Sequence, residues 1–251
     1  MNEQFIIKGT ALVTGAGRGL GQAMAVGLAN AGADIACADI IDTKETVIQV
    51  KKQGRKATGY HLDVTSQESL DKVVSQVITD FGRIDILVNN AGILRSGPSE
   101  TLSAKDWDAV INVNLTGQFR CAQTVGRQMI TQKAGRIINI SSVAGLFGSP
   151  TSVAYCASKA GVLLMTKTLA IEWAKYNVLV NAICPGIFIT DMTNQMINDP
   201  QFKQMIHARV PLGRYANPAE LSGTVVFLAS NAADYITGSA IVVDGGWTAG
   251  L

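Results

Sequence analysis

Short, continuously apolar runs alternate along the chain with longer stretches in which apolar residues return every three or four positions. Continuous apolar runs of this length are typical of strands buried on both faces of a parallel sheet. They predict seven strands, near residues 11–15, 34–39, 58–64, 85–90, 136–141, 178–184 and 240–246. The helical spacing predicts helices at 19–31, 43–53, 67–81, 104–132, 155–176 and 218–229, with N-caps at Ser66, Ser103 and Asn217. We therefore expect an α/β fold with a doubly wound, Rossmann-type sheet of seven parallel strands and helices on both faces.

No change of composition divides the chain, so we expect residues 1–251 to form a single domain. The stretch at about 186–214 differs from the rest because it is richer in Met, Gln, Asn and Asp. It also falls between the last two predicted strands. This position indicates an inserted helical flap beside the substrate.

Composition and charge argue against several classes of function. The net charge of +2 is spread along the chain without a basic tail, so nothing indicates a nucleic-acid or membrane partner. The opening residues lack the apolar core of a signal peptide, and no run is long enough to span a membrane, so we expect a cytoplasmic protein. The four cysteines form neither C-x-x-C pairs nor zinc-site spacings, so we expect reduced thiols and no metal: Cys37, Cys121, Cys156 and Cys184.

A glycine-rich turn, TGAGRGLG at residues 14–21, follows the first predicted strand and leads directly into a helix. Gly15, Gly19 and Gly21 let the backbone approach phosphate oxygens, while free N–H groups and the helix dipole favour an anion. The spacing differs from the commoner G-x-G-x-x-G fingerprint, and such a turn can be purely structural. Its place between a strand and a helix leads us to interpret it as the pyrophosphate site of a dinucleotide.

Asp39 closes the second predicted strand, where a carboxylate can accept both hydroxyls of an adenosine ribose. The same carboxylate repels a 2′-phosphate, so Asp39 favours NAD over NADP as the cofactor. A solvated acid in a turn is the alternative interpretation. Arg18 complicates the choice, because a cation in the glycine turn can meet either a phosphate of NAD or the extra phosphate of NADP.

Tyr155 and Lys159 lie four residues apart at the start of a predicted helix, so their side chains share one face. A tyrosine that exchanges a proton near neutral pH must lower its pKa by about three pH units, which is roughly 4 kcal/mol. A lysine charge some 4 Å away supplies about that much at an effective dielectric constant near 20. Such a pair is common on ordinary helices, so it indicates little by itself.

Ser142 strengthens the catalytic interpretation of this pair. It ends the fifth predicted strand, thirteen residues before Tyr155, at the carboxyl edge where open α/β sheets place their ligands. Its hydroxyl can hydrogen-bond a reacting oxygen. Ser141 is a rival, but alternation along the strand points it to the opposite side. Asn114 is a polar residue inside a long predicted helix and decides nothing alone.

Together these motifs resemble those of the short-chain dehydrogenase/reductase family along essentially the whole chain. The resemblance includes an Asn-Asn-Ala-Gly motif at residues 89–92 and a Pro-Gly-x3-Thr segment at residues 185–190. It implies NAD(H)-dependent hydride transfer between nicotinamide and a secondary alcohol or ketone. In the tetrad it implies, Tyr155 exchanges the proton and Ser142 positions the substrate oxygen. Lys159 lowers the Tyr155 pKa and holds the nicotinamide ribose, and Asn114 holds a water in a proton relay.

The same resemblance implies a cofactor site drawn from distant parts of the chain. Asp63 contacts adenine, Asn90 and the backbone of Val64 line the adenosine side, and Phe188 and Thr190 line the nicotinamide amide. Phe188 departs from the aliphatic residue that is usual there. The full implied set is Gly15, Arg18, Gly19, Leu20, Gly21, Asp39, Asp63, Val64, Asn90, Tyr155, Lys159, Pro185, Gly186, Phe188 and Thr190.

The family resemblance also implies a homotetramer. One interface is formed by the helices at 104–132 and 155–176, and another by the Gly245–Trp247 end. For the substrate, the carboxyl-terminal run at 211–247 is more similar to sugar-acid dehydrogenases of the family than to carrier-protein reductases. Arg95, just after the Asn-Asn-Ala-Gly turn, offers a cation for a substrate carboxylate, although a solvated loop residue is an equal alternative.

Other functions stay open at this point. A 3-oxoacyl carrier-protein reductase shares the same motifs and generally uses NADPH, and a dehydrogenase of polyols or cyclic ketones needs no cation at Arg95. A dinucleotide-binding sensor that has lost its chemistry is the alternative outside enzymes, and the intact tetrad argues against it.

Overall fold

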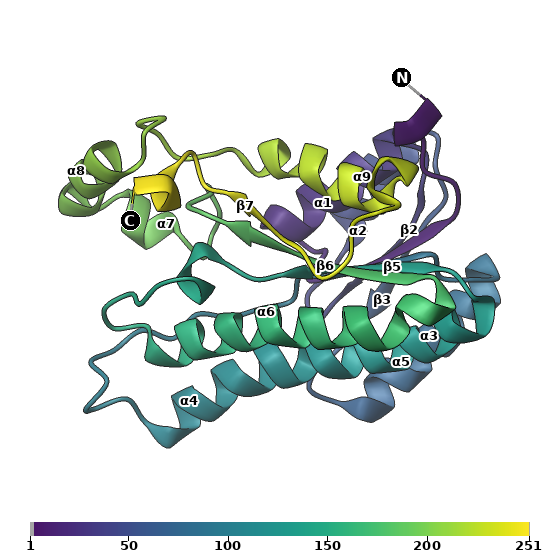
Figure 1. Cartoon of the computed structure of the whole chain (residues 1–251), viewed down its shortest axis with the longest axis horizontal. Helices are drawn as coiled ribbons and strands as arrows, with labels where there is room; N and C mark the ends of the chain where they lie inside the picture. Colours follow the sequence, from purple (N-terminus) through teal and green to yellow (C-terminus); the bar gives the residue numbers. More distant parts are fainter. Residues whose placement is uncertain (1–2, 251) are drawn as a thin grey trace.

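The computed structural model describes residues 3–250, and residues 1, 2 and 251 of the predicted domain lie outside that range. Its centre is a parallel sheet in the order β3-β2-β1-β4-β5-β6-β7 (Figure 1). The strands are β1 (Thr10–Thr14), β2 (Asp34–Asp39), β3 (Ala57–His61), β4 (Ile86–Asn89), β5 (Gly135–Ile140), β6 (Val178–Pro185) and β7 (Ala240–Val243). The predicted doubly wound sheet of seven parallel strands is confirmed.

Helices follow the strands in alternation, as a parallel sheet requires. The α-helices are α1 (Gly19–Asn30), α2 (Lys44–Lys52), α3 (Gln67–Phe81), α4 (Ala104–Ile111), α5 (Gln118–Gln132), α6 (Val153–Trp173), α7 (Asn194–Ile197), α8 (Pro200–Arg209) and α9 (Ser222–Ala229). The short helices are η1 (Glu3–Phe5), η2 (Asn112–Gly117), η3 (Val143–Gly145), η4 (Ala174–Tyr176), η5 (Pro218–Leu221), η6 (Asn231–Ala233) and η7 (Trp247–Gly250).

Two apolar cores lie on the two faces of the sheet. On one face, α1 and α9 pack over the strands, with Met24, Leu28 and Leu228 almost fully buried. On the other, α3, α5 and α6 cover the sheet through residues such as Leu70 and Met129. The central strands are buried on both sides, which explains why their sequences are continuously apolar.

The helix predicted over 104–132 contains an irregular turn at a functional position. Residues Asn112–Gly117 form a π-helical turn, η2, between α4 and α5. A π-turn adds one residue to the helix without ending it, so apolar spacing alone does not reveal it. The predicted caps Ser66 and Ser103 are confirmed, since each side chain accepts a backbone N–H in the first turn of its helix.

The segment 186–214 follows β6 and carries the short helices α7 and α8, as expected for a helical insertion. Figure 1 shows these helices beside the C-terminal turn at one end of the molecule. The two ends of the segment are tied together, because Ile189 N donates to Ala216 O at 2.9 Å and Ala216 N donates to Ile187 O at 3.0 Å. Phe188, between them, is buried in the core.

Candidate active site

The glycine turn after β1 has a backbone that side chains would obstruct. Gly15 and Gly19 adopt φ values of +66° and +58°, in the left-handed region that favours glycine. A Cβ on Gly21 would lie 1.9 Å from the carbonyl oxygen of Gly15, well inside contact distance. The turn is therefore a narrow cradle that leads to the N-terminus of α1, where backbone N–H groups attract an anion. Leu20 is partly buried against the core below it.

Asn90 supports this cradle from the neighbouring strand. Its Nδ2 donates to the carbonyls of Thr14 at 3.0 Å and Gly15 at 3.1 Å, and its backbone N–H donates to the Thr14 hydroxyl. Both amide protons are thus used within the protein. That Asn90 lines the adenosine side stays a prediction.

Asp39 ends β2 beside the same turn. Its Oδ2 accepts the N–H of Gly17 at 2.8 Å, and its Oδ1 accepts the N–H of Ile41 at 3.2 Å. A carboxylate has about four acceptor positions, so two stay available for ribose hydroxyls. Asp63, beyond β3, accepts the N–H and hydroxyl of Thr65.

Segment 186–214 faces the cradle. A Cβ on Gly19 would lie 3.5 Å from Thr190, and Arg18 Nη1 donates to Asp191 Oδ2 at 2.8 Å. The side chain of Phe188 points into the apolar core, so only its backbone can face a cofactor. Pro185 and Gly186 lie at the end of β6, where a Cβ on Gly186 would be 2.8 Å from Asp244 Cα.

Ser142, Tyr155 and Lys159 converge at the carboxyl end of β5. Ser142 Oγ accepts the N–H of Ala144 at 3.1 Å. Burial raises the pKa of Tyr155, and a hydrogen bond with Ser142 acts in the opposite direction. Lys159 Nζ donates to the carbonyl of Ile140 at 2.8 Å, and it lies 5.6 Å from the centre of the Tyr155 ring.

This geometry differs from the expected effect of Lys159 on Tyr155. The predicted ammonium about 4 Å from the phenol would lower the Tyr155 pKa, yet the pKa is raised because burial dominates. Burial also lowers the pKa of Lys159, to about 8. The ammonium instead lies against a backbone carbonyl. Both groups are thus displaced toward their neutral forms, as expected for two buried ionisable side chains.

Asn114 joins this group from the π-helical turn and is fully buried. Its Oδ1 accepts the N–H of Ile93 at 2.8 Å, and its Nδ2 donates to the carbonyl of Ile93 at 2.9 Å. It also donates to Ser158 Oγ at 3.3 Å. Asn114 therefore fixes the loop after β4 to the helix that carries Tyr155 and Lys159.

Three supporting side chains were not predicted. Ser141 Oγ donates to the backbone carbonyl of Lys159 at 2.8 Å, Ser158 Oγ donates to the carbonyl of Tyr155 at 2.7 Å, and Gln118 Nε2 donates to Ile140 O at 3.2 Å. Strand alternation did place Ser141 opposite Ser142, but it could not indicate that Ser141 anchors the next helix.

The predicted substrate cation is not isolated. Arg95 is on the loop after β4, its side chain is 56% exposed, and its Nε lies 3.9 Å from Asp106 Oδ1. At this distance the acid compensates part of the charge that a substrate carboxylate would meet.

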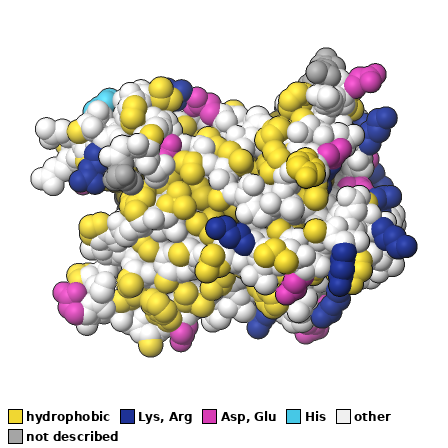
Figure 2. All heavy atoms as spheres, viewed as in Figure 1, with side chains coloured by type: hydrophobic (Ala, Val, Ile, Leu, Met, Phe, Trp, Pro, Cys, Tyr) yellow, Lys and Arg dark blue, Asp and Glu magenta, His cyan; other side chains and the backbone are white. Residues whose placement is uncertain are grey.

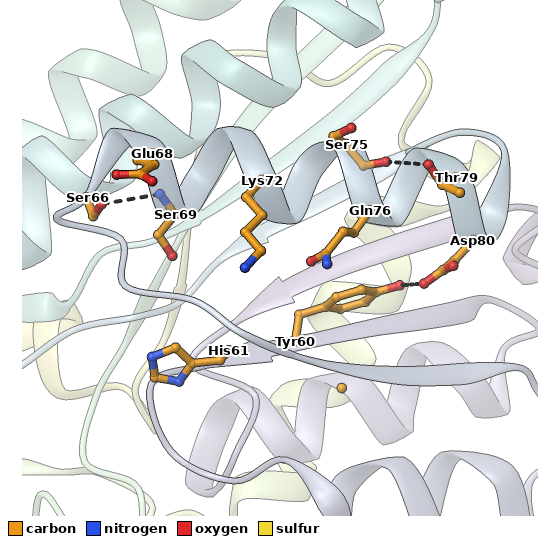
Figure 3. A pocket seen from close by; sticks show the side chains of 11 residues that line it. Tyr60, His61, Ser66, Glu68, Ser69, Lys72, Ser75, Gln76, Thr79 and Asp80 are labelled. Carbon is orange, nitrogen blue, oxygen red and sulfur yellow. Dashed lines mark hydrogen bonds between the residues drawn. The ribbon is translucent and has the colours of Figure 1, made fainter.

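Two hollows of the surface lie away from this group of residues. One of about 700 Å³ lies between β3 and α3, where Tyr60 Oη donates to Asp80 at 2.6 Å and Lys72 points toward the strand (Figure 3). No tetrad residue lines it. Among residues 3–250 there is no group of three or more His, Cys, Asp or Glu side chains that could hold a metal ion, and no helix is long and apolar enough to cross a membrane.

A doubly wound sheet with a glycine cradle, a strand-end aspartate and a converging Ser-Tyr-Lys-Asn group defines a dinucleotide-dependent oxidoreductase. The chain belongs to the short-chain dehydrogenase/reductase family. The family model that matches it, over residues 15–248, is described as enoyl-(acyl carrier protein) reductase.

The relatives of this chain include both gluconate-type dehydrogenases and carrier-protein reductases. A 2-dehydro-3-deoxy-D-gluconate 5-dehydrogenase of Dickeya dadantii is 45% identical over 240 residues, which cover 95% of each chain. A 3-oxoacyl-(acyl-carrier-protein) reductase of Thermotoga maritima is 43% identical, over 94% of this chain and 96% of the relative. The solved structure of a gluconate 5-dehydrogenase from Burkholderia cenocepacia, in complex with NADP and tartrate, matches with a TM-score of 0.95 and 37% identity over 99% of each chain.

Proposed function

We propose that this protein is an NAD(H)-dependent dehydrogenase that acts on a secondary hydroxyl or keto group of a gluconate-like sugar acid. The observation that carries the proposal is the convergence of Ser142, Tyr155 and Lys159 beside the glycine cradle, at one edge of the sheet. The cradle fits a dinucleotide, because its glycines leave the backbone N–H groups at the N-terminus of α1 free of side chains, and a Cβ on Gly19 would meet nothing nearer than Thr190, 3.5 Å away. When bound, nicotinamide supplies the hydride acceptor or donor.

The protein's own residues then bind the substrate oxygen and move its proton. Ser142 donates a hydrogen bond to that oxygen, and Tyr155 takes up or returns its proton. Because burial raises the Tyr155 pKa, the phenol is the resting form, which suits it as the proton donor in ketone reduction. In the oxidation direction, a positive charge near the phenol is needed to lower that pKa, and Lys159 supplies it when protonated. Asn114 keeps the neighbouring loop and helix in register around this site.

Asp39 supports NAD as the cofactor. Its carboxylate retains acceptor positions toward a ribose and repels a 2′-phosphate. The ratio of kcat/KM for NADH and NADPH tests this, and Asp39→Ala should move the ratio toward NADPH. A wild-type enzyme that prefers NADPH by about tenfold, a difference of roughly 1.4 kcal/mol, would refute the assignment.

The names of the gluconate-type relatives support a sugar acid as substrate. The Thermotoga maritima relative and the description of the matching family model support a second candidate, a carrier-protein reductase. A screen that follows NADH and NADPH absorbance separates the two, with gluconate-type acids in one arm and 3-oxoacyl thioesters in the other. Turnover confined to the thioesters would refute the sugar-acid proposal.

Arg95 remains our candidate for the substrate carboxylate. If it pairs with the acid, Arg95→Ala should lower kcat/KM on sugar acids by about 30-fold, or roughly 2 kcal/mol, and leave neutral polyols unchanged. Lys105→Ala removes another exposed charge from the same region and is the matched control. Equal activity on acids and polyols, unaffected by Arg95→Ala, would end the sugar-acid interpretation.

We also propose a cytoplasmic homotetramer. Large apolar side chains are exposed on α4, α5 and α6, including Trp107, Phe119, Leu164 and Ile171. Figure 2 shows hydrophobic side chains over the face that carries α4 and α6. Such a face favours association with another copy. Light scattering that finds a monomer at micromolar concentration would contradict the tetramer.

A further inference from the structure

Arg18, in the glycine turn, pairs with a carboxylate from a distant part of the chain. Asp39 is close to the same turn, but both of its oxygens accept backbone N–H groups, from Gly17 and Ile41. Arg18 Nη1 instead donates to Oδ2 of Asp191, 173 residues further along the chain, at 2.8 Å. The ion pair thus joins the glycine turn to segment 186–214.

The backbone before Asp191 is held in place, so the carboxylate is presented to Arg18 by a fixed support. Thr190 N donates to Thr193 Oγ1 at 3.0 Å, and Thr193 Oγ1 donates to the carbonyl of Phe188 at 2.6 Å. Phe188 is 2% exposed and anchors this turn in the core. The backbone position of Asp191 beside the glycine turn is therefore set by the fold.

A guanidinium in this turn is the group that a 2′-phosphate would use, because it offers several N–H donors to phosphate oxygens. We propose that Asp191 is a cofactor-discriminating residue, which pairs with Arg18 and withholds it from the 2′-phosphate of NADP(H). This inference rests on the proposed preference for NAD(H). It adds a second element to that preference: Asp39 repels the 2′-phosphate, and Asp191 occupies the cation that would attract it.

The exposure of the pair sets the size of the effect. The side chains of Arg18 and Asp191 are 66% and 68% exposed, so solvent screens their attraction. Exposed pairs of this kind change an equilibrium by about two- to fivefold. The ion pair with Asp191 therefore weakens NADPH binding only modestly. When NADPH binds, its 2′-phosphate replaces Asp191 as the partner of Arg18, and the bridge between the glycine turn and segment 186–214 is broken. NADH leaves the bridge intact.

The test is a double-mutant cycle on dissociation constants of NADH and NADPH, measured by cofactor fluorescence on the full-length protein. Asp191→Asn should tighten NADPH binding by about two- to fivefold and change NADH binding by less than about twofold. In an Arg18→Ala background the same substitution should change neither. High salt should reduce the difference between wild type and Asp191→Asn.

Glu220→Gln is the matched control. It also removes one acid from an exposed ion pair, with Arg214, but that pair lies outside the glycine turn. If it tightens NADPH binding as much as Asp191→Asn does, the effect is one of net charge and the inference fails. The inference also fails if Asp191→Asn leaves the ratio of the NADH and NADPH dissociation constants unchanged. It fails as well if the substitution changes that ratio equally in the Arg18→Ala background. The wild-type ratio by itself tests the preference for NAD(H), so the two failures are distinguishable.

Discussion

Replacing Lys159 with methionine should stabilise the fold while it abolishes activity. Lys159 is 3% exposed, and its ammonium donates to a backbone carbonyl. Methionine has a similar length and no charge, so it can fill the same space. The carbonyl of Ile140 would keep a hydrogen-bond partner, because Gln118 Nε2 also donates to it at 3.2 Å.

The pKa of Lys159 sets the magnitude and its pH dependence. Burial lowers that pKa from 10.5 to about 8, so the unfolded chain binds the proton more tightly than the folded protein does. The free energy of unfolding of the wild type therefore rises with pH between about 8 and 10.5, by roughly 3 kcal/mol in total. Below pH 8 the energetic cost of burying the charged ammonium is fully present. Loss of the hydrogen bond to Ile140 offsets about 1 kcal/mol of the gain in the variant.

We therefore expect Lys159→Met to increase the free energy of unfolding by about 2 kcal/mol at pH 7, and the gain to vanish by about pH 10.5. Urea unfolding of both proteins at several pH values, at one fixed protein concentration, measures this difference. A variant that is less stable than the wild type at pH 7 would refute the reasoning. A gain that stays constant from pH 8 to pH 10.5 would show that it does not come from the ammonium.

Two further substitutions test the site directly. Tyr155→Phe should lower kcat by about 100- to 10,000-fold, because the proton donor is lost, and leave the dissociation constant of NADH nearly unchanged; activity within about tenfold of wild type would rule out the role. Gly21→Ala should weaken NADH binding by about 10- to 100-fold, since the new Cβ would lie 1.9 Å from Gly15 O. Unaltered NADH binding by a folded Gly21→Ala protein would show that the cradle is not the cofactor site.

The fold was predictable from the sequence because burial on both faces makes each central strand a visible apolar run. The boundaries were less so: the run predicted as a strand over 58–64 forms a strand only at Ala57–His61. Strand β3 is at the edge of the sheet, where a partner on one side only allows the strand to end early. The separate 3₁₀ turn η5 before α9 likewise lies within the single helix expected over 218–229.

For the site, the sequence could identify chemical groups but not the contacts that satisfy them. Ser142, Tyr155 and Lys159 lie together at the carboxyl end of β5, since strand end and helix face determine their positions. The partners of Arg18 and Lys159 could not be predicted, because Asp191 comes from a segment whose spacing carries no periodic signal and the Ile140 carbonyl is a backbone group that no residue type marks. The ammonium lies over the Tyr155 ring, 5.6 Å from its centre, and it also donates to a buried backbone carbonyl that residue types could not indicate.

The π-helical turn at Asn112–Gly117 has a consequence for insertions and deletions in this region. Removing one residue from the turn would restore a regular α-helix and rotate everything before it by about 100° relative to α5. Asn114 would then leave Ile93 and Ser158, or α5 would turn Val125 and Met129 away from the sheet. The number of residues in this helix is therefore fixed. Its first half must place Asn114 against Ile93 and Ser158, its second half must pack α5 on the sheet, and the extra residue of the π-turn allows both.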